Sequence, residues 1–356
     1  MIDVLKLARA EIVALQPYQH ARWDPSLERL HANELPWRAL NDASIAGLNR
    51  YPEPQPAALI AGLATLYGVP ASQVLVARGS DEGIDLLTRA FCVAGHDAVI
   101  VCPPTFGMYA VAARIQGARV ISVPLMRATG FQLDVDAIER ALDRSVKMIY
   151  LCSPNNPTGN RLADADIDRV LAMCAERSLV VLDEAYVEFT AHASHARLLE
   201  RYPHLVILRT LSKAHGLAGA RVGAVLATPA IIQLLQKIIP PYAITQATIE
   251  TAAGALGSAA LAVTQSRVRA LVTERARVTQ QIAGCPGVTK VWHSDANFLL
   301  VEFADPGSAF ALIQRAGLIV RDVRYMPGLE RALRISLGSP QQNDRVAASL
   351  REMNEQ

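Results

Sequence analysis

The chain has 356 residues, of which 51% are hydrophobic and 19% charged, and its 35 basic and 33 acidic side chains leave a net charge of +2. This length exceeds what one hydrophobic core usually accommodates, so we expect two lobes. The sequence has no basic cluster with interleaved aromatic residues, which argues against a nucleic-acid partner. It also has no run of about 18 uncharged apolar residues, which argues against a membrane span.

The N-terminus and the cysteines indicate a reducing, cytoplasmic location. Residues 1–11 alternate charged and apolar side chains and do not resemble the apolar block of a signal peptide. His192 and His195 occur in a polar stretch that we interpret as a solvated loop, and no spacing typical of a metal site is found. The cysteines are odd in number and scattered, as expected for buried free thiols: Cys92, Cys102, Cys152, Cys174 and Cys285.

The first 40 residues are too few for a domain and are predicted to form an arm. An amphipathic helix should end near Leu15, and an irregular segment follows it. The arm offers the polar side chains of Tyr18 and Asn33, which can equally be ordinary turn or cap residues. Residues 50–56 carry three prolines and must be extended or turning, which holds Tyr51 rigidly.

From residue 57 onward, the hydrophobic pattern alternates between helix and strand. A helix at 57–68 precedes the first strand, and later helices end near residues 94, 117, 142 and 177. The predicted strands are 74–77, 98–101, 120–123, 147–151, 179–182, 205–208 and 224–227. Strands that alternate with helices predict an α/β fold, in which helices cover both faces of a mostly parallel sheet.

The last third of the chain predicts a smaller α+β lobe. Helices continue to about residue 283, and Pro240-Pro241-Tyr242 interrupts them as a plausible hinge. Strands are predicted at 288–292, 297–303, 318–321 and 332–337, with a helix at 307–316 and another at the C-terminus. We therefore divide the chain into three parts: an arm that also contributes to the small lobe (1–40), a large domain (41–240), and an interdomain helix with a small domain (241–356).

Ligands of such sheets bind outside the carboxyl ends of the strands, where this sequence places its polar motifs. Lys213 follows the strand 205–208, beside Ser212 and eight residues before Arg221. A lysine amine can condense with an aldehyde, and the serine and arginine can hold a phosphate. An aldehyde that carries a phosphate is pyridoxal phosphate, although a lysine after a strand is more often a solvated surface residue.

Other strands end in side chains suited to the same ligand. Asp183 ends an apolar strand, so its carboxylate needs a partner such as a protonated pyridine nitrogen. Gly79-Ser80-Asp81 begins a helix and can receive a phosphate, unless Ser80 simply caps that helix. Tyr109 can lie on a flat heterocycle or in the core. Asn156 lies in a turn constrained by two prolines and a glycine.

Two arginines of the smaller lobe are candidates for binding an anion. Arg321 and Arg334 both fall at predicted strand positions, and a guanidinium group can bind a carboxylate or a phosphate bidentately. Each arginine can equally belong to a structural ion-pair network, for which Asp322, Arg324 and Glu330 offer alternative partners.

Several motifs in one order resemble those of the fold type I pyridoxal-phosphate aminotransferases, and within them the histidinol-phosphate aminotransferase family. The resemblance covers nearly the whole chain. It rests on Pro17-Tyr18-Gln19, Asn33-Glu34, Arg50-Tyr51-Pro52-Glu53, Arg78-Gly79-Ser80-Asp81-Glu82, Pro104 to Tyr109, Cys152 to Gly159, Asp183 to Tyr186, Thr210 to Lys213 and Leu333 to Ser336. It implies a homodimer that uses pyridoxal phosphate and shares its active sites between subunits.

The resemblance also implies a role for each matching residue. Lys213 would hold the cofactor covalently and, once freed by the substrate amine, would move the reacting proton. Asp183 would keep the ring nitrogen protonated, which makes the ring an electron sink. Asn156 and Tyr186 would bond to the phenolic oxygen of the ring, and Tyr109 would stack on the ring. The remaining cofactor contacts, most of them to its phosphate, would come from Ser80, Asp81, Ser212, Arg221 and, from the neighbouring subunit, Tyr51.

The implied reaction passes the amino group of L-histidinol phosphate to 2-oxoglutarate, which becomes glutamate, in histidine biosynthesis. The positions that match the family's substrate-binding residues are Tyr18, Asn33, Arg321 and Arg334. An aromatic amino-acid aminotransferase and a decarboxylase of a phosphorylated hydroxyamino acid would use the same lysine and aspartate, and both remain alternatives. A transcription factor with an aminotransferase-like sensor domain would need an additional DNA-binding domain, and about 40 irregular residues precede the first motif.

Two residues depart from the family pattern. His215 stands where a large apolar aromatic residue is expected, and Phe106 stands where tyrosine is common. Neither has an assigned catalytic role, but both would change the polarity of the pocket.

Overall fold

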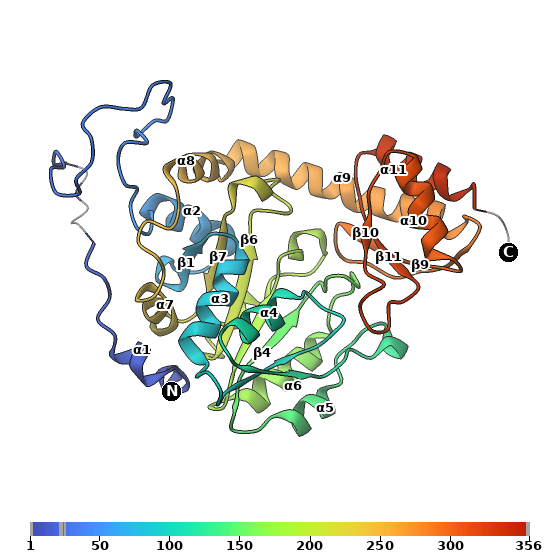
Figure 1. The fold of residues 1–356 in the computed structure, drawn as a ribbon, viewed down its shortest axis with the longest axis horizontal. Coiled ribbons are helices and arrows are strands. Elements are labelled where there is room, and N and C mark those ends of the chain that lie inside the picture. The colour runs from blue at the N-terminus through green and yellow to red at the C-terminus, as the bar shows by residue number, and fades with distance from the viewer. Residues whose placement is uncertain (1–2, 21–23, 25, 354–356) are drawn as a thin grey trace.

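The computed structural model describes residues 3–20, 24 and 26–353, which form a large lobe and a small lobe joined by a long helix (Figure 1). The large lobe contains a seven-stranded sheet with the order β1-β7-β6-β5-β4-β2-β3. Strand β7 runs antiparallel to both β1 and β6, whereas the other neighbouring strands are parallel. The predicted α/β fold with a mostly parallel sheet is therefore confirmed.

The elements of the large lobe follow the predicted alternation of strands and helices. The strands are β1 (Val74–Ala77), β2 (Ala98–Val101), β3 (Arg119–Ser122), β4 (Val146–Cys152), β5 (Leu179–Asp183), β6 (Leu205–Thr210) and β7 (Gly223–Leu226). The helices are α2 (Ala57–Tyr67), α3 (Ser80–Phe91), α4 (Met108–Ile115), α5 (Val135–Ala141), α6 (Asp164–Cys174) and α7 (Pro229–Gln236).

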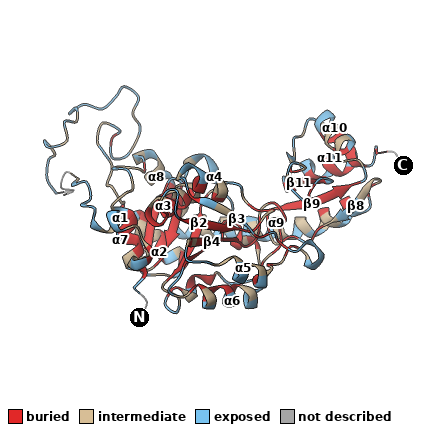
Figure 2. Cartoon of the chain, turned by 60° about the horizontal axis from the view of Figure 1, so that its bottom comes forward, coloured by how far each residue is buried: buried red, intermediate tan, exposed pale blue. Residues whose placement is uncertain are grey.

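Helices cover both faces of the large sheet in two hydrophobic clusters. One cluster joins α3, α4 and α7 to the strands through residues such as Leu87, Tyr109 and Leu235. The other joins α2, α5 and α6 to the opposite face through residues such as Leu63 and Leu171. Successive residues of a strand enter alternate clusters, because side chains of a strand point to opposite faces. Except for the edge strand β3, whose residues are exposed or partly exposed, the strands are consequently buried on both sides (Figure 2), which explains their mostly apolar sequences.

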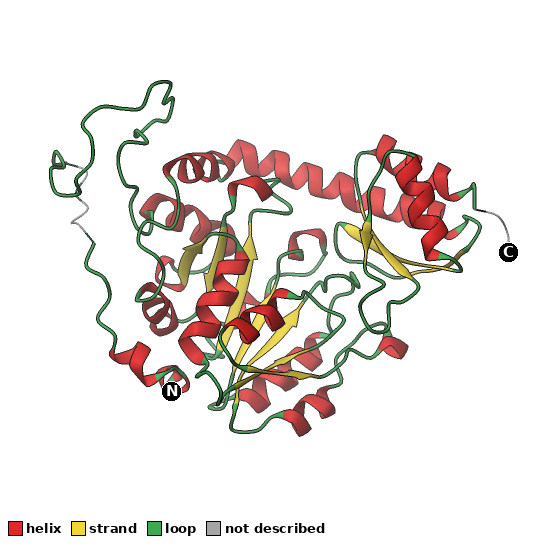
Figure 3. Cartoon of the chain, in the orientation of Figure 1, coloured by secondary structure: helices red, strands yellow, loops and turns green. Residues whose placement is uncertain are grey.

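The small lobe is built on a four-stranded antiparallel sheet with the order β10-β11-β9-β8. Its strands are β8 (Val288–Val291), β9 (Phe298–Phe303), β10 (Arg321–Asp322) and β11 (Ala332–Ser336). Helices α9 (Ser258–Ala283), α10 (Pro306–Arg315) and α11 (Pro340–Leu350) contribute to its core. The long helix α9 runs from the large lobe into the small one (Figure 3). The predicted α+β lobe is confirmed.

The N-terminal arm differs from the prediction in two ways. In place of one helix, it has a 3-10 turn at Val4–Leu7 and the short helix α1 (Ala10–Ala14), because Arg9 between them is extended. Val4 and Leu7 are buried in the large lobe, where the turn contacts α7. The arm thus packs at the end of the molecule away from the small lobe (Figure 1), contrary to the predicted contribution of residues 1–40 to that lobe.

One strand of the small lobe begins later than predicted. The strand expected at 318–321 is β10, which spans Arg321–Asp322. The chain turns at Gly317, whose φ is 72°, and Leu318 and Val320 then pack beside the small-lobe core as coil residues. Their apolar character reflects this packing, which a periodicity argument cannot distinguish from strand pairing.

The hinge predicted at residues 240–242 does not separate the two cores. Helix α8 (Gln246–Ala255) follows it and still packs on α2. Ile244 and Ala252 are buried in the core of the large lobe. The division of the chain into the domains 1–40, 41–240 and 241–356 stays a prediction.

All five cysteines are buried free thiols, as predicted. Among the described residues, no single helix is long and apolar enough to cross a membrane. Helices α8 and α9 together satisfy the length and composition required, but they are bent by 71° relative to each other.

Candidate active site

A cavity of about 490 Å³ lies at the carboxyl ends of the large-lobe strands, and residues of the small lobe complete its wall. The carboxyl ends of parallel strands meet at one edge of a sheet, so polar turns that are distant in sequence converge there. Most of the predicted site residues line this cavity: Ser80, Asp81, Asn156, Asp183, Tyr186, Ser212, Lys213, Arg221, Arg321 and Arg334. The predicted residues outside its lining are Tyr18, Asn33, Tyr51 and Tyr109.

Lys213 lines the cavity from the turn that follows β6. The backbone carbonyl of Lys213 accepts a hydrogen bond from the N–H of Gly216 at 3.1 Å, which closes this turn. The Nζ atom lies 5.5 Å from the centre of the Tyr186 ring. Burial and the positive charge of Arg334 lower the pKa of Lys213. A lowered pKa increases the fraction of neutral amine, which is the nucleophilic form.

Asp183 is the last residue of β5, and only 3% of its surface is exposed. Its Oδ1 accepts a hydrogen bond from the backbone N–H of Ala185 at 3.0 Å, and its Oδ2 accepts one from the Tyr109 hydroxyl at 2.8 Å. Burial raises the pKa of Asp183 to about 6, although both hydrogen bonds favour the charged form. A cationic group on the cavity side would keep this carboxylate ionised at neutral pH.

Tyr109 lies in a different place from the one that ring stacking requires. It is fully buried and stacks on Tyr150, with ring centroids 4.8 Å apart. Phe106 lines the cavity and meets Tyr109 edge to face at 5.6 Å. Helix α4 begins at Met108, so Tyr109 faces the core while Phe106 stays in the preceding turn. Tyr109 thus orients the carboxylate of Asp183, and Phe106 supplies an aromatic side chain to the cavity wall at this turn.

The predicted phosphate contacts gather beside the N-terminus of α3. The guanidinium of Arg221 donates hydrogen bonds to Oγ of Ser212 at 3.3 Å and to the carboxylate of Asp81 at 3.1 Å. Arg221 adopts a left-handed conformation with φ of 56°, which is uncommon for a residue with a side chain. The strain is consistent with a functional requirement for the guanidinium at this place.

Two glycines allow this close approach. A Cβ atom at Gly79 would lie 2.5 Å from the guanidinium of Arg221. A Cβ atom at Gly223 would lie 2.4 Å from the backbone of Gly79 and Ser80. The glycines therefore bring the first N–H groups of α3 and the guanidinium to one place, which suits a phosphate.

Asn156 lines the cavity because its neighbour anchors the loop. The side chain of Asn155 accepts a hydrogen bond from the Thr105 hydroxyl and donates one to the carbonyl of Pro104, both at 2.8 Å. These bonds tie together the turns that follow β2 and β4. The Oδ1 atom of Asn156 accepts a hydrogen bond from Arg334, which connects the large lobe to the small one.

Arg321 and Arg334 lie directly opposite each other in the antiparallel pair β10 and β11. Like charges in opposed positions destabilise a sheet unless an anion offsets them. Asp322 pairs with Arg324 at 2.7 Å, and, within the described part of the chain, neither Arg321 nor Arg334 has a carboxylate at ion-pairing distance. Burial lowers the pKa of Arg334, and its Nε atom is buried without a hydrogen-bond partner among the described residues. The guanidinium groups of Arg321 and Arg334 therefore have N–H donors available to bind an anion.

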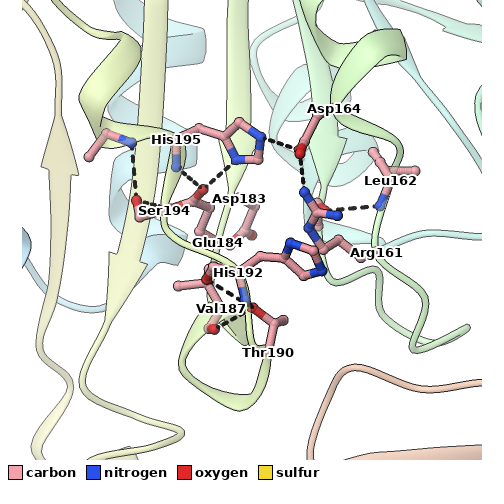
Figure 4. Close-up of polar contacts among 12 residues, drawn as sticks. Arg161, Leu162, Asp164, Asp183, Glu184, Val187, Thr190, His192, Ser194 and His195 are labelled. Atoms are coloured by element: carbon pink, nitrogen blue, oxygen red, sulfur yellow. Dashed lines mark hydrogen bonds and ion pairs between the residues drawn. The ribbon is translucent and has the colours of Figure 1, made fainter.

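His195 does not lie in a solvated loop, so this part of the prediction is wrong. It is 6% exposed, and its ring nitrogens lie 2.9 Å from the carboxylates of Glu184 and Asp164 (Figure 4). Although burial opposes the change, these carboxylates raise the pKa of His195. Glu184 and Asp164 come from other segments of the chain, so the polar sequence around His195 could not predict that this side chain is buried. His192 is exposed, as predicted.

Besides Phe106, eleven residues line the cavity that the sequence did not single out as site residues: Thr105, Gly107, Met108, Val111, Cys152, Pro157, Ala185, Thr210, Val323, Tyr325 and Met326. Those at 105–111 follow β2 at the same edge of the sheet as the predicted residues, so the strand-end argument could have found them. Those at 323–326 follow β10, and only the contact between the lobes brings them to the cavity.

A second cavity, of about 600 Å³, lies between the lobes. Several of its polar side chains are already hydrogen-bonded within the protein. Gln132, for example, donates to the carbonyl of Arg161 and accepts from the N–H of Ala163. Few directed polar groups are left for a ligand, so we assign the chemistry to the first cavity.

Comparisons with known proteins agree with this assignment. The family model described as aminotransferase class I and II matches residues 29–350. The chain belongs to this family. The aminotransferase is 48% identical to the histidinol-phosphate aminotransferase of Stenotrophomonas maltophilia, over 98% of this chain and 96% of the relative. Membership of the histidinol-phosphate aminotransferase family, predicted from the motifs, is thereby confirmed.

Solved structures resemble this aminotransferase closely. The histidinol-phosphate aminotransferase from Sinorhizobium meliloti, in complex with pyridoxal-5'-phosphate, has a TM-score of 0.75 at 26% identity, covering 85% of this chain and 82% of that one. The histidinol-phosphate aminotransferase from Clostridium acetobutylicum has a TM-score of 0.77 at 19% identity, covering 85% and 90%, and supports the fold alone.

Proposed function

We propose that this aminotransferase transfers the amino group of L-histidinol phosphate to 2-oxoglutarate, giving imidazole acetol phosphate and glutamate, in histidine biosynthesis. The observation that carries the proposal is the opposed pair Arg321 and Arg334 on the small-lobe side of the cavity. Histidinol phosphate carries a phosphate and no carboxylate, whereas glutamate carries carboxylates. A guanidinium binds either anion, so one pair of arginines serves both half-reactions.

Pyridoxal 5'-phosphate fits the residues that line the cavity. When bound, it supplies an electron sink for the electron pair left when the substrate carbon loses a proton. Lys213 provides the amine that bonds to its aldehyde, and the buried carboxylate of Asp183 provides the counter-charge for a protonated ring nitrogen. The N–H groups of α3, with Ser80, Ser212 and Arg221, bind its phosphate.

The chain's own residues orient the reactants and move the proton. Lys213, whose lowered pKa favours the neutral amine, would take the proton from the substrate carbon and deliver it to the cofactor. Asn156 and Tyr186, which line the cavity, would bind the phenolic oxygen of the cofactor ring. Tyr109 fixes the orientation of Asp183 through its hydroxyl. Phe106 would lie beside the ring and exclude water from it.

We further propose a cytoplasmic homodimer with shared active sites. The arm exposes large apolar side chains over residues 27–48, and Leu30 and Leu40 are 95% and 94% exposed. Exposed apolar surface on this scale is typical of an interface. Tyr18 and Asn33 of the arm, and Tyr51 of the segment that follows it, lie outside the lining of this chain's own cavity, which suits a role in the active site of a second copy. The free thiols suit a reducing compartment.

A single-turnover measurement tests the substrate. The purified protein is mixed with histidinol phosphate or with phenylalanine at equal concentration, and the absorbance of the bound cofactor is followed. We expect faster conversion by histidinol phosphate. Preference for phenylalanine would indicate an aromatic amino-acid aminotransferase. Release of carbon dioxide from a phosphorylated hydroxyamino acid would indicate a decarboxylase.

Sedimentation velocity tests the assembly. We expect the mass of a dimer for the wild-type chain and a shift toward monomer for Leu30→Asp with Leu40→Asp, because charges on an apolar interface are costly to bury. The exposed substitution Ile319→Asp on the small lobe is the control and should leave the mass unchanged. A wild-type monomer would contradict the proposal.

A further inference from the structure

A group of buried polar side chains surrounds Arg209 of β6, four residues before Lys213. Arg209 is 6% exposed, and its Nη2 donates a hydrogen bond to Glu188 at 2.7 Å. Its Nη1 lies 3.6 Å from the carboxylate of Glu184, and its guanidinium carbon lies 4.4 Å from the centre of the Tyr67 ring. Glu184, in turn, is hydrogen-bonded to the side chains of Ser194 and His195 (Figure 4).

Several atoms of this group have hydrogen-bonding capacity that the protein does not use. Within the described part of the chain, no partner is found for the Tyr67 hydroxyl, Oε2 of Glu188, Nε of Arg209, or either ring nitrogen of His215, although all are shielded from solvent. Such groups are rarely left unpaired in native proteins, because the loss of solvation is not recovered. Arg209 Nε can only donate a hydrogen bond and Glu188 Oε2 can only accept one, whereas the Tyr67 hydroxyl and the His215 ring can do either. The same small polar molecule could therefore bond to several of these groups at once.

His215 joins this group through the packing of its turn. Ala214, the residue before it, packs against a hydrophobic cluster that includes Ala185 and Phe189, on either side of Glu188 in sequence. The N–H of Glu184 bonds to the carbonyl of Leu208, so this segment begins beside β6. The turn with Lys213 and the segment with Glu188 therefore lie against each other.

The charge state of His215 suits a neutral bridging role. Burial lowers its pKa, an effect that Glu188 opposes and Arg209 reinforces. A neutral imidazole has one donor and one acceptor nitrogen. A phenylalanine at position 215 would fill the same space without either.

We propose that Tyr67, Glu188, Arg209 and His215 enclose buried water, and that this hydrated cluster makes His215 a positioning residue for Lys213. Buried water usually makes two to four hydrogen bonds to polar groups that lack other partners. The hydrogen bond from Gly216 to the carbonyl of Lys213 closes the turn around His215, so a fixed imidazole restrains the lysine. The positioning role rests on the proposed function of Lys213, whereas the bound water does not.

A crystal structure of the full chain with its cofactor, at a resolution that shows ordered water, tests the cluster. We expect density within about 3.2 Å of polar atoms from at least two of the four side chains. Side chains that repack onto one another without density between them would overturn the proposal.

Three variants test the positioning role. His215→Phe keeps the ring volume and removes both nitrogens, and His215→Gln keeps a hydrogen-bonding group. His204→Phe is the matched control. His204 is buried and, among the described residues, has one ring nitrogen shielded without a partner, but it precedes β6 at the other end of the strand. We expect His215→Phe to lower the melting temperature by about 2–4 °C and kcat by about 10-fold, with little change in KM.

The comparison among these variants decides the outcome. His215→Gln should recover most of the lost kcat, and His204→Phe should lower the melting temperature without lowering kcat. Equal losses of kcat in His204→Phe and His215→Phe, or a His215→Phe variant that matches the wild type in both measurements, would refute positioning by His215. A melting shift in His215→Phe without a change of kcat would also refute positioning by His215. Failure of the proposed function is detected separately in Lys213→Ala, which would keep normal turnover if Lys213 were not the reacting amine.

Discussion

Replacing Asp183 with Asn should stabilise the cofactor-free protein while it removes most of the activity. The side chain is 3% exposed, and burial raises the pKa of Asp183 from 3.8 to about 6. At pH 7.5 the carboxylate is ionised in both the folded and the unfolded chain, so the folded state carries the whole cost of that shift. At about 1.4 kcal/mol per pKa unit, the cost is about 3 kcal/mol.

The pH dependence of this effect has a definite sign. Because the folded pKa lies above the unfolded one, the group favours folding fully below about pH 4, and this contribution is lost as pH rises to about 6. The amide does not titrate. The advantage of Asp183→Asn over the wild type should therefore be near its maximum at pH 7.5 and about half of that at pH 5.

Urea unfolding of the cofactor-free chain at these two pH values measures the difference. The control is Asp136→Asn, whose carboxylate is exposed and paired with Arg169, and which should leave the free energy of unfolding nearly unchanged. A variant that is less stable than the wild type at pH 7.5, or equally improved at both pH values, would refute the reasoning. Added cofactor should stabilise the wild type more than the variant, since the variant lacks the counter-charge for the ring nitrogen.

Three further substitutions probe the rest of the site. Lys213→Ala should lower kcat by at least about 10²–10⁴-fold and prevent covalent attachment of the cofactor, as mass spectrometry after borohydride reduction would show; normal turnover would contradict the assignment. Arg334→Gln should lower kcat/KM for histidinol phosphate by about 10–100-fold and affect the unphosphorylated amine histidinol much less, and equal losses would place the anion elsewhere. Gly223→Ala should weaken cofactor binding by about 10-fold or more in a titration of the cofactor-free protein. The reason is that its Cβ would meet the backbone of Gly79 and Ser80 at 2.4 Å. Unchanged affinity would mean that the backbone at the start of α3 can shift to make room.

Residues at the ends of strands were predictable because the signal for them is local. Asp183, Asn156 and Lys213 each follow a continuous apolar run, and a parallel sheet brings such ends to one edge. The direction of a side chain near a helix start was not predictable in the same way. Tyr109 and Phe106 are three residues apart in one turn, and only the start of α4 at Met108 decides which of them faces the core.

The sequence by itself determined the order of strands and helices, the edge of the sheet that binds the ligand, and the family. These depend on periodicity and on short motifs, which are properties of neighbouring residues. Only the tertiary structure decided that Arg321 lies opposite Arg334, that His195 is buried between two carboxylates, and that Ala214 packs against the cluster that contains Ala185 and Phe189. The partners in these contacts are far apart in sequence, and they are chosen by packing between elements, which local patterns do not encode.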